Sequence, residues 1–382
     1  MNPPMARPRL VLVGGGRAHL YVLRELVRRP IPDVDVVIVA PGDPYHTAMV
    51  AGYLQGQYAA AELRFDLTGL AARARARFVH ATPHRVDVDE RSVIAGSEKI
   101  AFDFCSLDLG CDASDIATPG VAAHAIPLQP AERVLELRAR LDALIAEARP
   151  LSIIVVGGGD LAVESALAIK QRLSASSAPG NVALVERGAE LLTDYEPEMR
   201  ALARDVLRTR GVSLVLGGRV ASVTATSLKL HSGATMPADL IVWAETPCAP
   251  AIVARSGLPH DDGGFLLVDR SLHAVDGTPV WGAGDCVSVK DFPGLPRTSR
   301  YTVRFAPTLD RSLRSALGQG RPGRYRPQRS PLMLLNTAGG WALMQWKGVH
   351  SHSRWACRLK DMIDRRFVRR FRGSDEKPRS GS

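Results

Sequence analysis

Two glycine-rich turns constrain this chain more than any other feature, because each lies between an apolar strand pattern and a helical pattern. The first, Gly14-Gly15-Gly16, follows the apolar residues 10–13. The second, Gly157-Gly158-Gly159, follows residues 152–156. A strand, a tight glycine turn and a helix N-terminus together form the site where Rossmann-like domains hold the pyrophosphate of a dinucleotide. The fold class predicted is therefore α/β, with two Rossmann-like dinucleotide-binding domains.

In the first unit, Gly14 permits the sharp turn, and Gly16 lets a pyrophosphate approach the backbone without a Cβ in the way. The helix that follows, residues 18–28, would direct its N-terminal amides at the phosphates. Two residues depart from the usual pattern. His19 stands where a third glycine is usual, and Ala40 stands where an acid would bind the ribose. A glycine turn without a cofactor is the alternative for this unit.

A third segment, residues 278–286, contains an apolar strand that ends in Gly284-Asp285. An aspartate at the end of a strand, far along the chain from the glycine turn, is the feature that a flavin site uses to hold the ribityl chain. The combination favours FAD, with its pyrophosphate at the first glycine turn and its ribityl end near Asp285.

In the second unit, Gly157 and Gly159 form the turn, and Ala162 is the small residue where helix meets sheet. The next strand ends at Glu186. A carboxylate there suits the ribose 2′-hydroxyl and would repel a 2′-phosphate, so NADH is favoured over NADPH. The neighbouring Arg187 keeps NADPH as the alternative.

Glu164 lies in the first turns of the helix that follows the second glycine turn. From there its carboxylate could point toward the nicotinamide and the flavin, which makes it the candidate catalytic residue. A carboxylate that only stabilises the helix N-terminus is the alternative. Hydride transfer between these rings requires no acid or base, because the cofactors supply the reactivity and the protein supplies alignment and electrostatics.

The five cysteines of the 382-residue chain are scattered, and the first of them is Cys105. The chain therefore lacks the closely spaced cysteine pair that disulfide reductases carry after the first glycine turn. Redox roles for Cys111 and Cys286 are minor alternatives to flavin-only electron transfer. No Cys/His cluster predicts a metal, and no signal peptide or long apolar run is present, so a cytoplasmic protein is expected.

The C-terminal segment carries much of the net charge of +10, with eight basic and two acidic side chains in residues 354–372. A hairpin is predicted from residues 332–335 and 341–346, then a helix from about 353 to 371, then a disordered tail, 373–382. The apolar residues expected on one side of the helix are Trp355, Leu359, Met362, Ile363, Phe367 and Phe371.

Three roles compete for this basic helix. It could dock on the protein with a solvated basic face. It could lie peripherally on the anionic inner face of a membrane, or it could form an oligomer contact such as a homodimer. Nucleic-acid binding is not expected, because no recognised binding motif accompanies the charge.

With these motifs the chain resembles the flavoproteins of the pyridine-nucleotide-disulfide oxidoreductase type. Within that group it is most similar to the type II NADH:quinone oxidoreductases, and closer still to the NADH-dehydrogenase-like flavoproteins that sometimes occur fused to selenide, water dikinase. The resemblance implies hydride transfer from NADH to FAD and then electron delivery to an acceptor. The segments that carry it are residues 14–19, 44–53, 106–110, 157–164, 282–285 and 355–367.

The resemblance also implies the domain organisation. The FAD domain comes in two pieces, and the NADH domain is inserted between them. The expected boundaries are 1–120 and 271–325 for the FAD domain, 121–270 for the NADH domain, and 326–372 for a small α/β C-terminal part. His46, within the matching segment 44–53, could face the flavin, although a structural role is favoured.

Departures from the family pattern leave the acceptor open. Phe305 replaces a glutamine expected near the flavin and the quinone, and Glu245 follows Ala244 where Ala-Thr-Gly is usual. A quinone acceptor is favoured. A sulfide- or selenide-directed flavin oxidoreductase and a degenerate, non-catalytic flavoprotein are the alternatives. The residues predicted to bind FAD or NADH are Gly14, Gly15, Gly16, Arg17, Ala18, His19, Gly157, Gly159, Ala162, Glu186, Gly284, Asp285 and Phe305.

Overall fold

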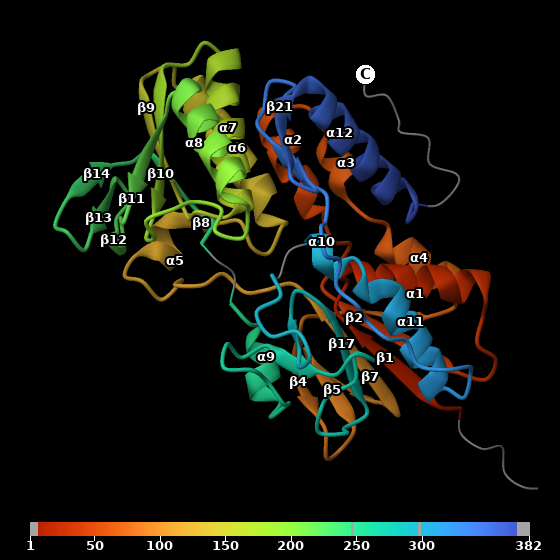
Figure 1. The fold of residues 1–382 in the computed structure, drawn as a ribbon. Coiled ribbons are helices and arrows are strands. Elements are labelled where there is room, and N and C mark those ends of the chain that lie inside the picture. The colour runs from red at the N-terminus through yellow and green to blue at the C-terminus, as the bar shows by residue number, and fades with distance from the viewer. Residues whose placement is uncertain (1–6, 246–247, 297–298, 373–382) are drawn as a thin grey trace, which may run out of the picture.

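The computed structural model describes residues 7–245, 248–296 and 299–372. Two five-stranded sheets form the centres of two adjacent domains (Figure 1). The first sheet has the strand order β17-β7-β1-β2-β3, and every neighbouring pair runs parallel. Its strands are β1 (Arg9–Val13), β2 (Asp35–Ala40), β3 (Arg77–His80), β7 (Phe104–Leu109) and β17 (Val280–Gly284).

The second sheet has the order β11-β10-β9-β15-β8, and it is parallel throughout. Its strands are β8 (Ala125–Pro127), β9 (Leu151–Val156), β10 (Gly180–Glu186), β11 (Val212–Leu216) and β15 (Leu240–Trp243). All of them lie in the sequence between β7 and β17 of the first sheet. The prediction of two Rossmann-like domains, the second inserted into the first, is therefore confirmed, while the exact domain boundaries remain predictions.

Helices pack beside both sheets. In the first domain, α1 and α11 pack against each other, and α11 contacts β17. In the second domain, α7 contacts β9, β10 and β11. The helices are α1 (Arg17–Arg28), η1 (Thr47–Met49), α2 (Val50–Gln55), α3 (Ala60–Leu63), α4 (Leu67–Arg73), α5 (Val121–His124), α6 (Arg133–Ala146), α7 (Asp160–Ala175), α8 (Pro197–Thr209), α9 (Ala251–Arg255), α10 (Ser299–Thr302), α11 (Phe305–Ala316) and α12 (Arg354–Arg369).

Smaller sheets border the two domains. Three of them are antiparallel and three-stranded, whereas β16 and β18 form a parallel pair. Their strands are β4 (Pro83–Asp87), β5 (Ser92–Ala95), β6 (Glu98–Ala101), β12 (Val220–Val223), β13 (Ser227–Leu230), β14 (Thr235–Pro237), β16 (Leu266–Val268), β18 (Val287–Val289), β19 (Met333–Asn336), β20 (Ala342–Trp346) and β21 (Val349–Ser353).

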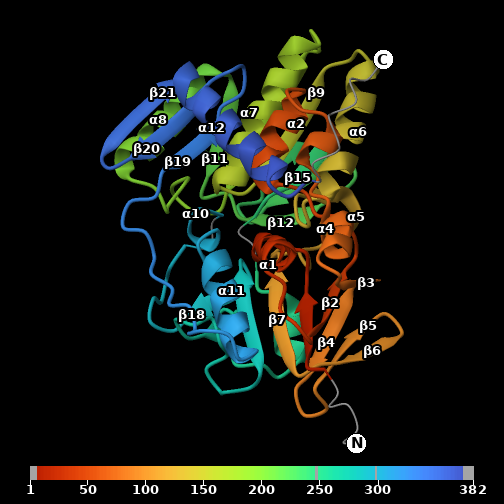
Figure 2. The ribbon, with the colours of Figure 1, turned by 90° about the vertical axis from the view of Figure 1, so that its right-hand side faces the viewer.

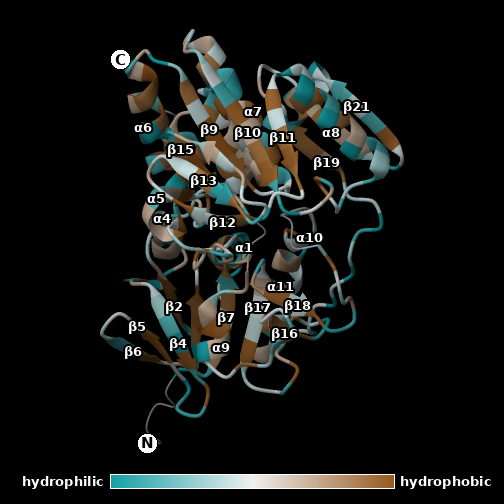
Figure 3. Ribbon diagram, turned by 90° about the vertical axis from the view of Figure 1, so that its left-hand side faces the viewer, coloured by the Kyte–Doolittle hydropathy of each residue, from teal (hydrophilic) through white to brown (hydrophobic). Residues whose placement is uncertain are grey.

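The central strands form as expected because they are β-branched, apolar runs that are buried on both faces, by helices and by the smaller antiparallel sheets. Four of the five residues of β1 and five of the six in β9 are buried. Hydrophobic residues accordingly concentrate along the strands of both sheets, whereas many loops are hydrophilic (Figure 3).

Helix α2 joins the three parts of the molecule. It belongs to the first domain in sequence, yet it packs against α7 of the second. Its Val50 and Leu54 share one hydrophobic core with Val163 of α7 and with Met333 and Leu335 of β19. Figure 2 shows α2, α7 and α12 close together above the first sheet. The relative position of the domains is therefore fixed by a continuous core.

The C-terminal part confirms the predicted hairpin, as β19 and β20, and adds a third strand, β21, that was not predicted. Helix α12 begins after Ser353, whose side chain accepts a hydrogen bond from the Ala356 amide at 3.1 Å. The predicted disordered tail lies outside the described residues, as do Thr246 and Pro247. Among the described helices, none is long and apolar enough to cross a membrane.

The exposure of individual side chains shows which face of α12 packs on the protein. Trp355 and Met362 are 60% and 57% exposed, whereas Lys360 and Asp364 are buried. Helical periodicity predicted the helix but not its rotation. The rotation is set by ionic and polar partners on other elements, which stabilise the two buried charged side chains.

Candidate functional site

A cavity of about 960 Å³ lies where the two domains meet the C-terminal part. The second glycine turn lines it through Gly158 and Gly159, and the first domain contributes Arg17 and Asp285. Lys360 contributes from α12. A single space therefore connects residues that the sequence assigns to two different cofactors.

The second glycine turn is open toward this cavity. A Cβ on Gly159 would meet no heavy atom within 4 Å, although Gly159 is the N-cap residue directly before α7. Gly157 has a φ of 126°, and its Cβ would lie 2.2 Å from the Ala244 carbonyl oxygen, so only glycine fits there. Ala162 is fully buried within α7. These features fit a pyrophosphate at the N-terminus of α7.

The part of the cavity beside the second glycine turn is acidic. Glu186 lines it at the end of β10, and its Oε1 accepts a hydrogen bond from the Gly188 amide at 2.6 Å. Arg187 pairs with Asp115 at 3.0 Å and lies 3.8 Å from Glu245. Among described residues 121–270, no basic side chain lines the cavity, whereas the following acids do: Asp160, Glu164, Glu186, Glu190, Asp194 and Glu245.

The first glycine turn is closed from inside by Asp108, at the end of β7. The Asp108 carboxylate accepts hydrogen bonds from the amides of Ala18 and His19 at 2.6 and 2.9 Å. Its carbonyl oxygen accepts the Gly16 amide at 3.0 Å. The expectation that the amides of Ala18 and His19 face a phosphate is therefore corrected. Sequence reasoning missed Asp108, although an acid inside the apolar strand 104–109 was a signal.

His19 fills the place of the missing third glycine. Its ring is completely buried, with Nδ1 2.7 Å from the Gly14 carbonyl oxygen and Nε2 2.9 Å from the Ser106 hydroxyl. Burial lowers the pKa of His19, although Asp108 acts in the opposite direction. A neutral imidazole thus ties helix α1 to its own turn and to β7.

Asp285 follows β17, and its carboxylate has the environment that a hydroxyl-bearing ligand requires. It lines the cavity, and its Oδ1 is buried without a hydrogen-bond partner among the described residues. Burial raises the pKa of this carboxyl, while Arg17 counteracts the shift. Buried polar atoms in proteins are almost always satisfied, so a donor such as a ribityl hydroxyl fits this position.

The placement of Phe305 differs from the expectation. Its side chain is 2% exposed and packs against Tyr325, with ring centroids 4.5 Å apart. The neighbouring Val303 and Arg304 line the cavity instead. Phe305 therefore contributes to the core of the first domain, and its ring is not positioned to stack on a ligand in the cavity.

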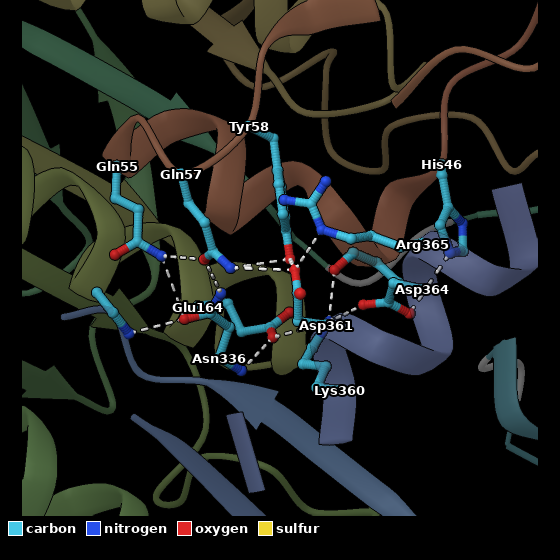
Figure 4. A network of polar contacts seen from close by, with 12 residues as sticks. His46, Gln55, Gln57, Tyr58, Glu164, Asn336, Lys360, Asp361, Asp364 and Arg365 are labelled. Carbon is cyan, nitrogen blue, oxygen red and sulfur yellow. Dashed lines mark hydrogen bonds and ion pairs between the residues drawn. The ribbon is translucent and has the colours of Figure 1, made fainter. Parts of the chain in front are cut away.

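Four buried titratable side chains line the cavity in a row from α7 to the segment before η1 (Figure 4). They are Glu164, Lys360, Asp364 and His46. The Lys360 ammonium donates to Asp364 Oδ2 at 2.8 Å and to the Ala48 carbonyl oxygen at 2.5 Å. It lies 3.9 Å from Glu164 Oε1. On the far side, His46 Nε2 lies 3.5 Å from Asp364 Oδ1.

The environment of each group shifts its pKa differently. Burial raises the pKa of Glu164 to about 7, against the opposing effects of Lys360 and of the Asn336 amide that donates to Oε1. Burial also acts to raise the pKa of Asp364, but Lys360 and His46 outweigh it, so the pKa lies below its usual value. Burial lowers the pKa of His46, against Asp364. At neutral pH this arrangement can hold or release a proton.

A second layer of polar contacts holds α12 in place. The Tyr58 hydroxyl donates to Asp361 Oδ1 at 2.6 Å, and Arg365 pairs with both Asp361 and Glu62. Sequence reasoning counted the charges of α12 but did not identify these contacts. Their partners lie about three hundred positions away in the chain, so no local pattern could have revealed them.

The five cysteines are free, and burial raises the pKa of Cys105 and Cys286. Cys111 is buried, with its Sγ 3.3 Å from the Asp285 carbonyl oxygen. Raised thiol pKa values oppose thiolate chemistry. Away from the cavity, Glu196, Glu198 and His350 have ligand atoms within 4.8 Å of one another.

The chain matches a known protein family and is similar to curated proteins of related activity. The family model described as pyridine nucleotide-disulphide oxidoreductase matches residues 8–308. Demethylphylloquinone reductase NdbB of Synechocystis is 26% identical over 314 residues, which cover 77% of this chain and 76% of the relative. Type II NADH:quinone oxidoreductase of Haemophilus influenzae is 23% identical over 231 residues, 52% of each protein.

Two solved structures have the same fold. NDH2 from Plasmodium falciparum, in complex with NADH, superposes with a TM-score of 0.80 at 11% identity, covering 95% of this chain and 98% of that one. The sulfide:quinone oxidoreductase of Aquifex aeolicus also gives 0.80, at 17% identity, covering 96% and 91%.

Proposed function

Because the chain belongs to the pyridine nucleotide-disulphide oxidoreductase family, we propose that it is an FAD-dependent enzyme that takes hydride from NADH and delivers electrons to a quinone. The observation that carries this proposal is the single cavity that joins the second glycine turn to Asp285 and to Lys360 of α12. Relatives named as a demethylphylloquinone reductase, an NAD(P)H-ubiquinone oxidoreductase and a type II NADH:quinone oxidoreductase support the reaction type. FAD, when bound, supplies two-electron chemistry, and the protein supplies alignment and electrostatics.

The residues proposed to hold FAD come from two parts of the chain. Gly14, Gly15 and Gly16 with Arg17 would face the pyrophosphate, and Gly284 with Asp285 would face the ribityl chain. The buried Asp285 Oδ1, which has no hydrogen-bond partner among the residues that the structure describes, supports this assignment, because a buried carboxylate oxygen requires a donor.

Gly157, Gly159 and Ala162 are proposed to receive the pyrophosphate of NADH at the N-terminus of α7. Glu186 would accept the ribose hydroxyls. The acidic lining and the engagement of Arg187 with Asp115 and Glu245 both favour NADH over NADPH, because a 2′-phosphate beside Glu186 would meet carboxylates, and no basic side chain of the described residues 121–270 lines the cavity there.

We assign Glu164 to the boundary between donor and acceptor, where its carboxyl would adjust the charge near the reacting rings. With a pKa of about 7 it changes charge near neutral pH. Its contact with the Asn336 amide fixes the carboxyl in place.

The direct test is anaerobic. The purified protein should be yellow, and its flavin absorbance should bleach when NADH is added. Reoxidation with a panel of quinones, dyes and oxygen should then identify the acceptor. A colourless protein that cannot be reconstituted with FAD would overturn the proposal, and so would a yellow protein that NADH fails to bleach.

Residues 353–371 are proposed to contact the anionic inner face of a membrane peripherally. Trp355, Met362 and Ile363 are 60%, 57% and 42% exposed along α12. Exposed arginines accompany this stripe: Arg354, Arg358, Arg366, Arg369 and Arg370. Apolar anchors with a basic border suit an anionic bilayer and would bring a lipid-soluble acceptor to the cavity.

Vesicle sedimentation tests this contact. The protein should bind vesicles that contain phosphatidylglycerol and not vesicles of phosphatidylcholine alone. Trp355→Ser with Met362→Ser should weaken the binding, since both side chains leave water on docking. If the protein instead elutes as a homodimer that these substitutions convert to a monomer, the stripe is an interface between copies and the membrane assignment is wrong.

A further inference from the structure

We propose that His46, oriented by Asp364, hands a proton to the electron acceptor when that acceptor is reduced. The proposal rests on the proposed function and deepens it, because it assigns the acceptor a chemical class. That class is a two-electron acceptor whose oxygen atoms take up protons, such as a quinone.

The position of His46 carries the first step. It precedes η1, lines the cavity and is 4% exposed. Its ring stacks on Phe367 with centroids 5.2 Å apart and lies 5.5 Å from the Phe65 ring at a tilt. Aromatic neighbours thus hold the imidazole in one orientation at the cavity wall.

The two nitrogens of the ring have different environments. Nε2 lies 3.5 Å from Asp364 Oδ1. Nδ1 is buried and has no hydrogen-bond partner among the residues that the structure describes. A purely structural histidine would have both nitrogens satisfied, because burial of an unpaired polar atom is unfavourable. The unsatisfied nitrogen is therefore assigned to a ligand of the cavity.

Charged groups approach His46 from three helices. Asp364 and Lys360 face it from α12, and Arg17 acts on it from α1. Glu164 of α7 acts more remotely, through Lys360. Burial and the two cations lower the pKa of His46, whereas Asp364 raises it. The ring is therefore neutral at rest, with its proton on Nε2 toward the Asp364 carboxylate and Nδ1 free to accept one. When Nδ1 takes up a proton, Asp364 stabilises the imidazolium until a more basic atom accepts that proton.

The stoichiometry of quinone reduction requires such a proton. Hydride from NADH carries two electrons and one proton, whereas a quinone takes two electrons and two protons to become a quinol. The balanced reaction is NADH + H⁺ + quinone → NAD⁺ + quinol. The additional proton comes from solvent onto His46 Nδ1, passes from the imidazolium to a quinone oxygen as the C=O becomes C–OH, and leaves the ring neutral again. Ferricyanide takes single electrons and no proton, so its reduction does not need His46.

The test compares acceptors in one enzyme. In His46→Gln, anaerobic flavin reduction by NADH and reoxidation by ferricyanide should stay within about twofold of wild type, because neither step uses this proton. Reoxidation by menadione should fall at least about tenfold and lose its pH dependence. Asp364→Asn, which alters the positioning residue, should shift that pH profile. His352→Gln is the matched control, since its Nε2 pairs with Thr337 and it does not line the cavity.

A second readout needs no turnover. Calorimetric titration of menadione into the oxidised, FAD-loaded protein should show weaker binding for His46→Ala and near-normal binding for His46→Gln, whose amide retains a hydrogen bond. Menadione reoxidation at the wild-type rate in His46→Gln would overturn the inference, and so would an equal loss with ferricyanide. A wild-type enzyme whose flavin NADH does not bleach would instead reject the proposed function.

Discussion

The two glycine turns have the same strand–turn–helix pattern, but their third glycines have opposite surroundings. At the first turn, a Cβ on Gly16 would lie 2.2 Å from the Asp108 carboxyl carbon. At the second, a Cβ on Gly159 would meet nothing within 4 Å. At Gly16 a side chain would collide with the protein interior, whereas Gly159 leaves space for a ligand. One sequence pattern can thus serve packing and binding to different extents.

This difference matches the proposed roles of the two sites. FAD would remain in place through many turnovers, so its turn can be braced by Asp108 and His19 from within. NADH must enter and leave in each cycle, which an open turn permits.

The largest effect is expected from alanine at the two turns. Gly16→Ala should push the Asp108 carboxylate away from the α1 amides, lower stability by about 3 kcal/mol and release FAD. Gly159→Ala adds a methyl group to open space and should leave the thermal midpoint unchanged while raising the KM for NADH. Thermal melts followed by flavin fluorescence distinguish the two. Equal destabilisation by both substitutions would contradict the proposed difference between a packed first turn and an open second turn.

A smaller effect is expected from the carboxylate that follows the second turn. Glu186→Ala should shift the NADPH-to-NADH ratio of kcat/KM upward by about tenfold, roughly 1.4 kcal/mol, because the 2′-phosphate loses a like charge. Stopped-flow reduction with each nucleotide measures it. Glu190→Ala is the matched control on the same acidic wall, and an equal shift there would mean that overall charge, not the ribose contact, sets the preference.

Sequence reasoning succeeded for features that are local. The strand–turn–helix units, Glu186 at the end of β10 and the 332–346 hairpin all follow from periodicity and turn chemistry. It did not find Asp108 beneath the first turn or Lys360 and Asp364 in the cavity wall. The function of these residues depends on partners distant in the chain, and a charged residue in an isolated helix pattern is ordinarily solvated. Phe305 was misplaced for the same reason, because its neighbour Tyr325 was not foreseeable.

Glu164 connects the open turn to α12, and its titration should be visible in stability. Its pKa is about 7 in the folded protein against 4.5 unfolded, so the native state binds an extra proton between these values. The stabilisation that this proton gives the native state is fully present below about pH 4.5 and is lost as the pH rises through 7. Between pH 5 and 7, the free energy of unfolding of the wild-type protein should fall by up to roughly 1 kcal/mol per pH unit relative to that of Glu164→Gln. Denaturant midpoints measured at several pH values test this, and parallel curves would contradict it.

The smallest effect is expected at the thiols near the first site. Cys286 is buried within hydrogen-bonding distance of the Ala283 carbonyl, and Cys111 lies against Asp285, so both are close to the proposed FAD site. If flavin alone carries the electrons, Cys111→Ser and Cys286→Ser should each leave NADH-dependent quinone reduction within about twofold of wild type, because hydride transfer needs no thiolate. The contrary outcome is that the wild-type protein oxidises sulfide or selenide in place of NADH and that either substitution abolishes this activity. The first site would then perform thiol chemistry, and the difference between the two turns would not reflect the binding of FAD and NADH.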